Sequence, residues 1–193
     1  MLTTIIYAHP YDKSFNHAIL ETVTQKLKKQ GQTYQVLDLY ADGFNPVYKA
    51  EELALFSKGK AVDPLVQHYQ EVLNKSNRLI LIFPIWWYDV PAIVKGFFDK
   101  VFLKTYSYHE EKSGLLTGHL THIEEALILT TSTGPTWYLK IFGGNVIQKA
   151  VLNNTFKTVG IGNKSRKWFN VGRIARITDD KRRETLGKIA DLV

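Results

Sequence analysis

The chain has 193 residues, 45% of them hydrophobic, which is the size and composition of one domain over residues 1–193 with a full buried core. It contains no cysteine, which excludes disulfides, thiolate metal sites and cysteine nucleophiles, and no apolar run approaches the ~20 residues of a membrane span. The net charge of +7 is spread along the chain, so we expect solvated surface or an anionic small ligand rather than a nucleic-acid partner.

The first forty residues predict a parallel β-α-β unit. Residues Thr3–Ala8 are β-branched and apolar, as in a strand, and the first ten residues lack the basic region of a signal peptide. Ser14 is a candidate N-cap for an amphipathic helix over Phe15–Lys29, which Gly31 ends. A second strand follows at Tyr34–Leu39. A strand-helix-strand unit of this length implies a right-handed crossover between parallel strands.

The middle of the chain predicts helices around a central buried strand. Helical pieces are expected at Glu51–Lys58 and at Pro64–Lys75, the second with Asp63 as N-cap. The wholly apolar run in Arg78–Phe83 is typical of a central parallel strand. Apolar residues at three- and four-residue spacings predict a helix over Ala92–Phe102, with Pro91 setting φ for its first turn.

The second half of the chain continues the alternation of strands and helices. We expect, in order, a long connection (Leu103–His119), a strand (Ile123–Thr130), a short helix (Trp137–Phe142), a helix (Val146–Val159), a strand (Lys167–Val171) and a terminal helix (Thr178–Val193). Five strands alternating with helices predict an α/β fold, a flavodoxin-like doubly wound parallel sheet in the order 2-1-3-4-5 with helices on both faces.

Three loops should meet at one edge of this sheet, because the first, third and fourth strands are neighbours in that order. The first loop offers Ser14, Phe15 and Asn16 at a helix N-terminus, where free N–H groups favour an anion, and His9 nearby. Ser14 can also be read as a cap alone, and His9 as a satisfied turn residue. Neither a GxGxxG nor a Walker pattern is present, so those two phosphate-binding motifs are excluded.

The second loop carries Trp86, Trp87 and Tyr88, and the third is rich in hydroxyls at Thr131–Thr133. These aromatic rings could cap a core, but loops seldom carry so much rigid aromatic area without a ligand. An anion site, a flat aromatic wall and a donor-rich turn together predict a phosphorylated flat heterocycle, and a flavin fits best. We expect no metal.

The loop sequences resemble a known family. The segments AHPYDKSFN (Ala8–Asn16), FPIWWYDVPAIVKGFFDKVF (Phe83–Phe102), LLTGHL (Leu115–Leu120) and TTSTGPTWY (Thr130–Tyr138) resemble the flavodoxin-fold NAD(P)H:quinone oxidoreductases, and most closely their bacterial modulator-of-drug-activity-B type. The resemblance spans most of the chain. It implies a cytoplasmic, homodimeric enzyme that passes a hydride from NAD(P)H through the flavin N5 to a quinone. It also implies FAD, with FMN as the alternative, and the basic composition favours NADPH over NADH.

The resemblance also assigns roles to individual residues. It places cofactor-binding residues at His9, Ser14, Phe15, Asn16, Pro84, Ile85, Trp86, Trp87, Tyr88, Thr130, Thr131, Ser132, Thr133, Gly134 and Tyr138, and among these it makes Tyr138, Trp87 and Tyr88 catalytic. It implies that Tyr106 and Tyr108 reach a substrate pocket, in this family often across a dimer interface. The adenine position stays open, with the Lys164–Arg166 region as one candidate.

The chain departs from the family pattern at two places. Ser132 and Thr133 stand where the family usually has glycine, and the histidine that follows the equivalent of Tyr138 in mammalian members has no counterpart. Water, Tyr138, Tyr106 and Tyr108 therefore remain alternative proton donors. Azo or nitro reduction at the same site, and a regulatory subunit of a potassium efflux system, remain alternative functions.

Overall fold

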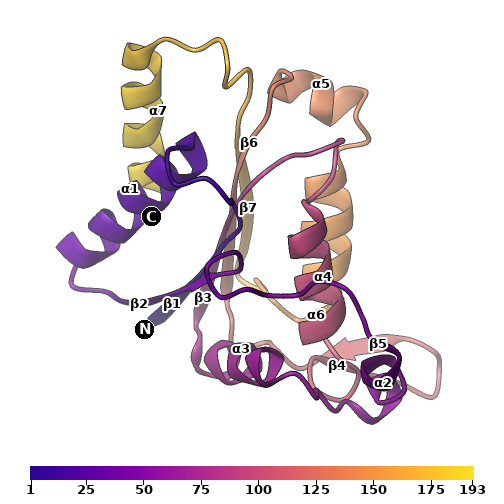
Figure 1. The fold of residues 1–193 in the computed structure, drawn as a ribbon. Coiled ribbons are helices and arrows are strands. Elements are labelled where there is room, and N and C mark those ends of the chain that lie inside the picture. Colours follow the sequence, from indigo (N-terminus) through magenta and orange to yellow (C-terminus); the bar gives the residue numbers. More distant parts are fainter.

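A computed structural model describes residues 1–193, and at its centre lies a five-stranded parallel sheet (Figure 1). The strand order β2-β1-β3-β6-β7 is the expected 2-1-3-4-5 order, because β6 and β7 are the fourth and fifth strands of this sheet. The strands are β1 (Leu2–Tyr7), β2 (Thr33–Asp38), β3 (Arg78–Pro84), β6 (Glu125–Thr131) and β7 (Ser165–Val171). The predicted fold class is therefore confirmed.

Helices cover both faces of the sheet (Figure 1). One face is covered by α1 (Phe15–Lys29) and α7 (Asp179–Leu192), and the other by α3 (Pro64–Lys75), α4 (Ala92–Val101) and the stretch formed by η2 (Ile147–Phe156) and α6 (Lys157–Val159). The central strand β3 shows why both faces are needed. Leu79 and Leu81 pack into one core and Ile80 and Ile82 into the other, because successive side chains of a strand point to opposite faces.

The capping residues set helix ends where the sequence predicted them. The Ser14 hydroxyl accepts a hydrogen bond from the His17 N–H at 3.1 Å, and Gly31 adopts φ +66° just beyond α1. The Asp63 carboxylate accepts from the Leu65 N–H at 2.9 Å, with Pro64 as the first residue of α3. Pro91 is the N-cap of α4, which begins at Ala92 as predicted.

The long connection predicted over Leu103–His119 is wrong in one respect, since it contains a small antiparallel hairpin. Its strands are β4 (Tyr108–Glu110) and β5 (Leu116–Gly118). Three-residue strands carry too little alternation to be seen in sequence. Gly118 fixes their position, because a Cβ there would lie 2.2 Å from the Val159 carbonyl carbon, so β5 packs directly on α6.

Two predicted helices are also corrected. The segment predicted over Glu51–Lys58 is divided into α2 (Ala50–Leu53) and the 3-10 turn η1 (Phe56–Lys58). The segment predicted over Val146–Val159 is π-helical in η2 before it tightens into α6. The apolar spacing identifies a buried helical face but does not distinguish these hydrogen-bonding patterns. None of the helices combines the length and the apolar character that crossing a membrane requires.

Candidate active site

The loops that follow β3 and β6 leave the sheet side by side. Phe83 pairs with Thr130 and Pro84 with Thr131, and the Ile85 N–H donates to the Thr131 carbonyl at 2.8 Å. Both strands therefore end at the same level, at the edge of the sheet where α5 (Thr136–Ile141) begins in Figure 1. Ligands of open α/β sheets bind at such an edge.

The aromatic loop after β3 is a tight two-residue turn. The Trp86 N–H donates to the Asp89 carbonyl at 3.1 Å, and the Asp89 N–H donates back at 3.0 Å. The two residues between them, Trp87 and Tyr88, have φ +50° and +68°. Turns of this kind favour asparagine or glycine, and a bulky residue in this conformation costs about 1–3 kcal/mol. Trp87 is nevertheless 94% exposed, so packing within the chain does not explain the strain.

A cavity of about 690 Å³ opens between this turn and the loop after β6. It is lined by Ile85, Trp86, Trp87, Tyr88, Ser132, Thr133, Gly134, Pro135, Tyr138 and Leu139. The structure thus brings together most of the residues predicted from the second and third loops. The N–H groups of Trp87, Tyr88, Thr133 and Gly134 donate no hydrogen bond within the chain. They are available to the carbonyl and imide groups of a flat ligand.

Pro84, Thr130 and Thr131 lie buried beneath this cavity and do not line it. The Thr130 hydroxyl donates to Asn170 Oδ1 at 2.8 Å and accepts from Trp168 Nε1 at 2.8 Å. Asn170 Nδ2 in turn donates to Ser132 Oγ at 2.9 Å. This network holds the loop after β6 in place through side chains of β7.

Sequence reasoning missed Trp168 and Asn170. Both point to the same side of β7, and Asn170 pairs in register with Thr130. The signal was an asparagine on a half-buried strand, since an amide with restricted access to water needs partners within the chain.

The first loop leaves free N–H groups at the start of α1, a position that favours an anion. The N–H groups of Phe15 and Asn16 donate no hydrogen bond within the chain. Asn16 is buried, its Nδ2 donates to the Thr131 hydroxyl at 2.9 Å, and its Oδ1 has no partner. Half-buried His9 accepts from the Tyr11 N–H through Nδ1 at 3.0 Å, and burial lowers the pKa of His9. His9 therefore acts as a neutral hydrogen-bonding group at neutral pH.

A second cavity, of about 520 Å³, lies beside the start of α1, between α1 and α7. Ser14 and Phe15 line it together with Lys13, Arg182 and Arg183, which sequence reasoning did not assign to the site. Arg182 Nε is buried without a hydrogen-bond partner. Only the fold could identify these cations, because α7 is more than 150 residues away from the first loop.

The Lys164–Arg166 region, expected as a candidate adenine site, lies at the opposite edge of the sheet. Ser165 starts β7 and pairs with Glu125, the first residue of β6. Lys164 Nζ is 2.7 Å from Glu124 Oε2, and the Arg166 guanidinium donates to the Ile161 carbonyl. That candidate is therefore corrected, because the amino ends of these strands point away from the site.

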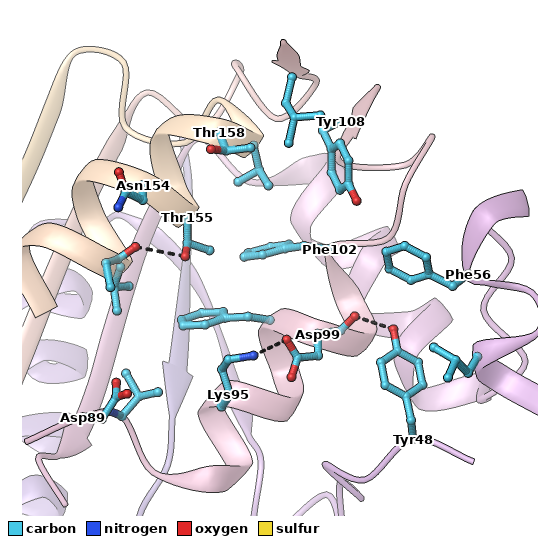
Figure 2. Close-up of a pocket in the computed structure, with 17 residues that line it drawn as sticks. Tyr48, Phe56, Asp89, Lys95, Asp99, Phe102, Tyr108, Asn154, Thr155 and Thr158 are labelled. Carbon is cyan, nitrogen blue, oxygen red and sulfur yellow. Dashed lines mark hydrogen bonds and ion pairs between the residues drawn. The ribbon is translucent and has the colours of Figure 1, made fainter. Parts of the chain in front are cut away.

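The two tyrosines expected at a substrate pocket are not brought to the aromatic cavity. The Tyr106 hydroxyl donates to the Gln70 carbonyl at 3.0 Å, and burial raises its pKa, so its hydroxyl points into the protein. Tyr108 lines a separate cavity of about 540 Å³. Figure 2 shows it there with Tyr48, Phe56 and Phe102, which line the same cavity. Tyr108 is separate from the aromatic cavity because it begins β4, which lies near the C-terminal end of α4 in Figure 1, whereas the aromatic turn precedes the N-terminal end of α4.

The donor set around the aromatic cavity fits a flavin. Flat rings and free N–H groups suit an isoalloxazine, the start of α1 suits a phosphate, and the unpartnered Asn16 Oδ1 suits a ligand hydroxyl. No three His, Asp or Glu side chains lie together as a set that could hold a metal ion. Fold and site thus define an α/β protein with a nucleotide-type ligand site at the carboxyl ends of its strands.

Comparison with known proteins places the chain in a family. Residues 1–191 match the family described as having a flavodoxin-like fold, and the chain belongs to that family. An uncharacterized NAD(P)H oxidoreductase of Haemophilus influenzae is 29% identical over 187 residues, covering 96% of this chain and 90% of the relative. The ribosyldihydronicotinamide dehydrogenase [quinone] of Mus musculus is 30% identical over 151 residues, covering 68% of this chain and 63% of that enzyme.

Solved structures agree with this placement. The NAD(P)H:quinone oxidoreductase from Methanothermobacter marburgensis has a TM-score of 0.87 and 28% identity, covering 99% of this chain and 96% of that one. Smu.1420 from Streptococcus mutans has a TM-score of 0.84 and 34% identity, covering 100% and 98%. An FMN-dependent NADH-azoreductase from Bacillus anthracis, solved with FMN, is similar at 15% identity and a TM-score of 0.75, covering 100% and 97%, which shows the shared fold alone.

Proposed function

We propose that this chain is a flavin-dependent NAD(P)H:quinone oxidoreductase, working as one domain in the cytoplasm. The observation that carries the proposal is the strained, exposed Trp87–Tyr88 turn set in register against the hydroxyl-rich loop after β6. Such strain persists at ligand sites, where binding offsets it. The names of the relatives support the same enzyme class, since they include NAD(P)H and quinone oxidoreductases.

A bound flavin would supply the redox chemistry, accepting two electrons from NAD(P)H and passing them to a quinone. The residues of the chain would position and stabilise the reactants. The free N–H groups of Trp87 and Tyr88 would donate to the reduced ring, where negative charge gathers. Trp87 and Tyr88 would also exclude water. The Tyr138 hydroxyl makes no hydrogen bond within the chain, so it is free to donate one to the acceptor at the cavity mouth.

The cavity between α1 and α7 supports FAD rather than FMN. FMN ends at one phosphate, which the start of α1 can bind, whereas FAD needs room for a second phosphate and an adenosine. The adjoining cavity offers this room, and its wall holds Lys13 and Arg182 to pair with phosphate, although Arg182 Nη1 also lies 3.5 Å from Asp179 Oδ1 in the same wall. For the nicotinamide donor we propose NADPH. The Arg173 N–H donates to the Gly134 carbonyl at 3.1 Å, so the main chain of an exposed arginine lies next to the loop that lines the aromatic cavity, and the net charge of the chain is +7.

The position of Tyr108 supports a homodimer. In one chain, Tyr108 lies in a cavity separate from the aromatic cavity, so it would reach a flavin only in a second copy. The cavity that holds Tyr108 is largely apolar, and apolar side chains from α4, η2 and β5 line it (Figure 2). An apolar recess of this kind suits a dimer interface.

The proposal is tested by the absorbance spectrum of the purified protein after incubation with FAD and gel filtration. A retained flavin spectrum that NADPH bleaches and menadione restores is the expected result. A protein that retains neither FAD nor FMN would contradict the proposal. Comparison of menadione with an azo dye and a nitroaromatic as acceptors then distinguishes quinone reduction from the alternative activities.

A further inference from the structure

The outer face of α5 is apolar and exposed, directly beside the aromatic cavity. Pro135, Tyr138 and Leu139 line the cavity. Trp137, Ile141 and Phe142, which we call the α5 shelf, are 53%, 69% and 68% exposed. Trp137 and Ile141 are four residues apart and so share one face of the helix. Single exposed apolar residues are normal, whereas a contiguous group marks a binding surface.

The shelf is continuous with the cavity through a series of aromatic rings. The ring of Tyr88 lies 6.3 Å from that of Tyr138, and the ring of Tyr138 lies 5.5 Å from that of Phe142. The Trp137 ring is 6.2 Å from Phe142. The contact between the turn and the end of α5 is close, because a Cβ at Gly143 would lie 3.0 Å from Tyr88 Cδ1. A ligand leaving the cavity over Tyr138 therefore meets apolar surface.

We propose that the quinone this chain reduces carries an apolar isoprenoid tail, and that the α5 shelf binds the tail while the head group occupies the aromatic cavity. The inference rests on the proposed quinone reductase activity. A small quinone without a tail would fill the cavity and leave the shelf in water. A tail would cover the rings of Phe142 and Trp137 and remove apolar surface of both partners from water.

Two other occupants of the shelf fit the structure less well. A membrane surface would select a ring of cations around the apolar residues. The one cation of α5, Lys140, turns back to the sheet instead, with Nζ 5.6 Å from the centroid of the Trp168 ring. A second copy of the chain would need an interface of about 800 Å² per partner, which the three shelf side chains do not provide on their own, and the proposed homodimer draws its interface from the separate cavity that holds Tyr108.

The experiment compares two quinones with one head group, menadione and menaquinone-2, using the FAD-loaded protein and NADPH. We expect kcat/KM to be about tenfold higher for menaquinone-2, since burial of a few methylene groups supplies such a factor. Phe142→Ser and Ile141→Ser should each reduce this preference and leave menadione turnover unchanged. Leu115→Ser, which replaces a 70% exposed leucine in the β4–β5 loop, is the matched control and should keep the preference.

Equilibrium dialysis of both quinones gives a second readout that does not depend on turnover. Tighter binding of menaquinone-2, weakened by Phe142→Ser and not by Leu115→Ser, supports the inference. Equal affinities in the native chain overturn it, even if menadione is reduced and the proposed function stands. Loss of a dimer in Phe142→Ser, seen by light scattering, also overturns it, because a second copy would then cover the shelf. If neither quinone is reduced or bound, the proposed function itself has failed.

Discussion

Asn16 Nδ2 donates a hydrogen bond to the Thr131 hydroxyl at 2.9 Å, and this bond joins the first turn of α1, just after the loop that follows β1, to the last residue of β6, just before the loop that follows it. β3 lies between β1 and β6 in the sheet, so the bond connects two loop regions whose strands do not pair with each other. Both residues are buried, and Asn16 Oδ1 keeps a free acceptor. One side chain thus links the free N–H groups at the start of α1 to the hydroxyl-rich loop, and its Oδ1 remains available to a ligand.

Asn16→Ala should weaken flavin binding more than it weakens the fold. The free energy of unfolding should fall by about 1–2 kcal/mol, because the Thr131 hydroxyl loses a buried partner. FAD affinity, measured by fluorescence titration of the apoprotein, should fall by about tenfold or more as both loops lose their connection. Ser76→Ala is the matched control. It removes a buried hydrogen bond to Thr4 near the other edge of the sheet and should lower stability without changing FAD affinity.

Trp87→Asn should raise the stability of the protein and weaken its flavin binding and turnover. Asparagine tolerates positive φ, and the exposed Trp87 side chain contributes no packing, so the free energy of unfolding should rise by about 1 kcal/mol. Flavin retention and kcat/KM should both fall, because the aromatic wall is lost. Thr105, an exposed β-branched residue at φ +69°, provides the control. Thr105→Asn should raise the free energy of unfolding to a similar degree and leave flavin retention unchanged. Unchanged flavin binding in Trp87→Asn would remove Trp87 from the site.

Local signals predicted the fold well, because they act within a few residues. Ser14 and Gly31 fixed both ends of α1, and the apolar run of β3 fixed its place at the centre of the sheet. The predicted strand order was the flavodoxin-like order usual for five strands alternating with helices, and it placed Trp87 and Thr133 at one end of the sheet without any knowledge of contacts.

Features that depend on distant contacts could not be predicted in this way. Asn170 holds the loop after β6, and Arg182 faces the start of α1, only because the sheet and α7 place them there. The family resemblance placed Tyr106 at a substrate pocket. In this chain the Tyr106 hydroxyl instead donates a hydrogen bond to the Gln70 carbonyl and points into the protein. The hydrogen-bonding pattern of η2 was hidden because α- and π-helical turns bury similar faces.

Lys100→Met should destabilise the protein far more than removal of a neighbouring surface lysine. Lys100 is 3% exposed, and its Nζ lies 2.9 Å from Glu52 Oε1 and 3.3 Å from Asp63 Oδ2. Its loss leaves two carboxylates facing each other, and breaking such a buried pair costs about 3–5 kcal/mol in urea unfolding. Lys95→Met, on the same helix, removes an exposed pair with Asp99 and should cost about 0.5 kcal/mol or less. Equal losses in both variants would contradict the buried role of Lys100.

His9 should make the apoprotein less stable as the pH falls below neutral. Burial lowers the pKa of His9 in the folded chain, so below an unfolded value of about 6.5 the unfolded chain takes up this proton first. The free energy of unfolding then decreases as the pH falls from about 6.5 towards the folded pKa. Urea unfolding at a series of pH values should show this slope in the native chain and a shallower one in His9→Gln. Exposed His68→Gln is the control, and a slope unchanged by His9→Gln would refute the assignment.

Arg182→Ala should weaken the binding of FAD and leave the binding of FMN almost unchanged. Arg182 lines the cavity between α1 and α7, and its Nε is buried without a partner, so a phosphate beyond the start of α1 could pair with it. FAD affinity of the apoprotein should fall by about tenfold, while FMN affinity should change by less than about twofold, because FMN does not extend into this cavity. Lys188→Ala, which removes an exposed pair with Glu184, should change neither affinity. Equal losses of FAD and FMN would place Arg182 at the first phosphate, and no loss of either would remove this cavity from the flavin site.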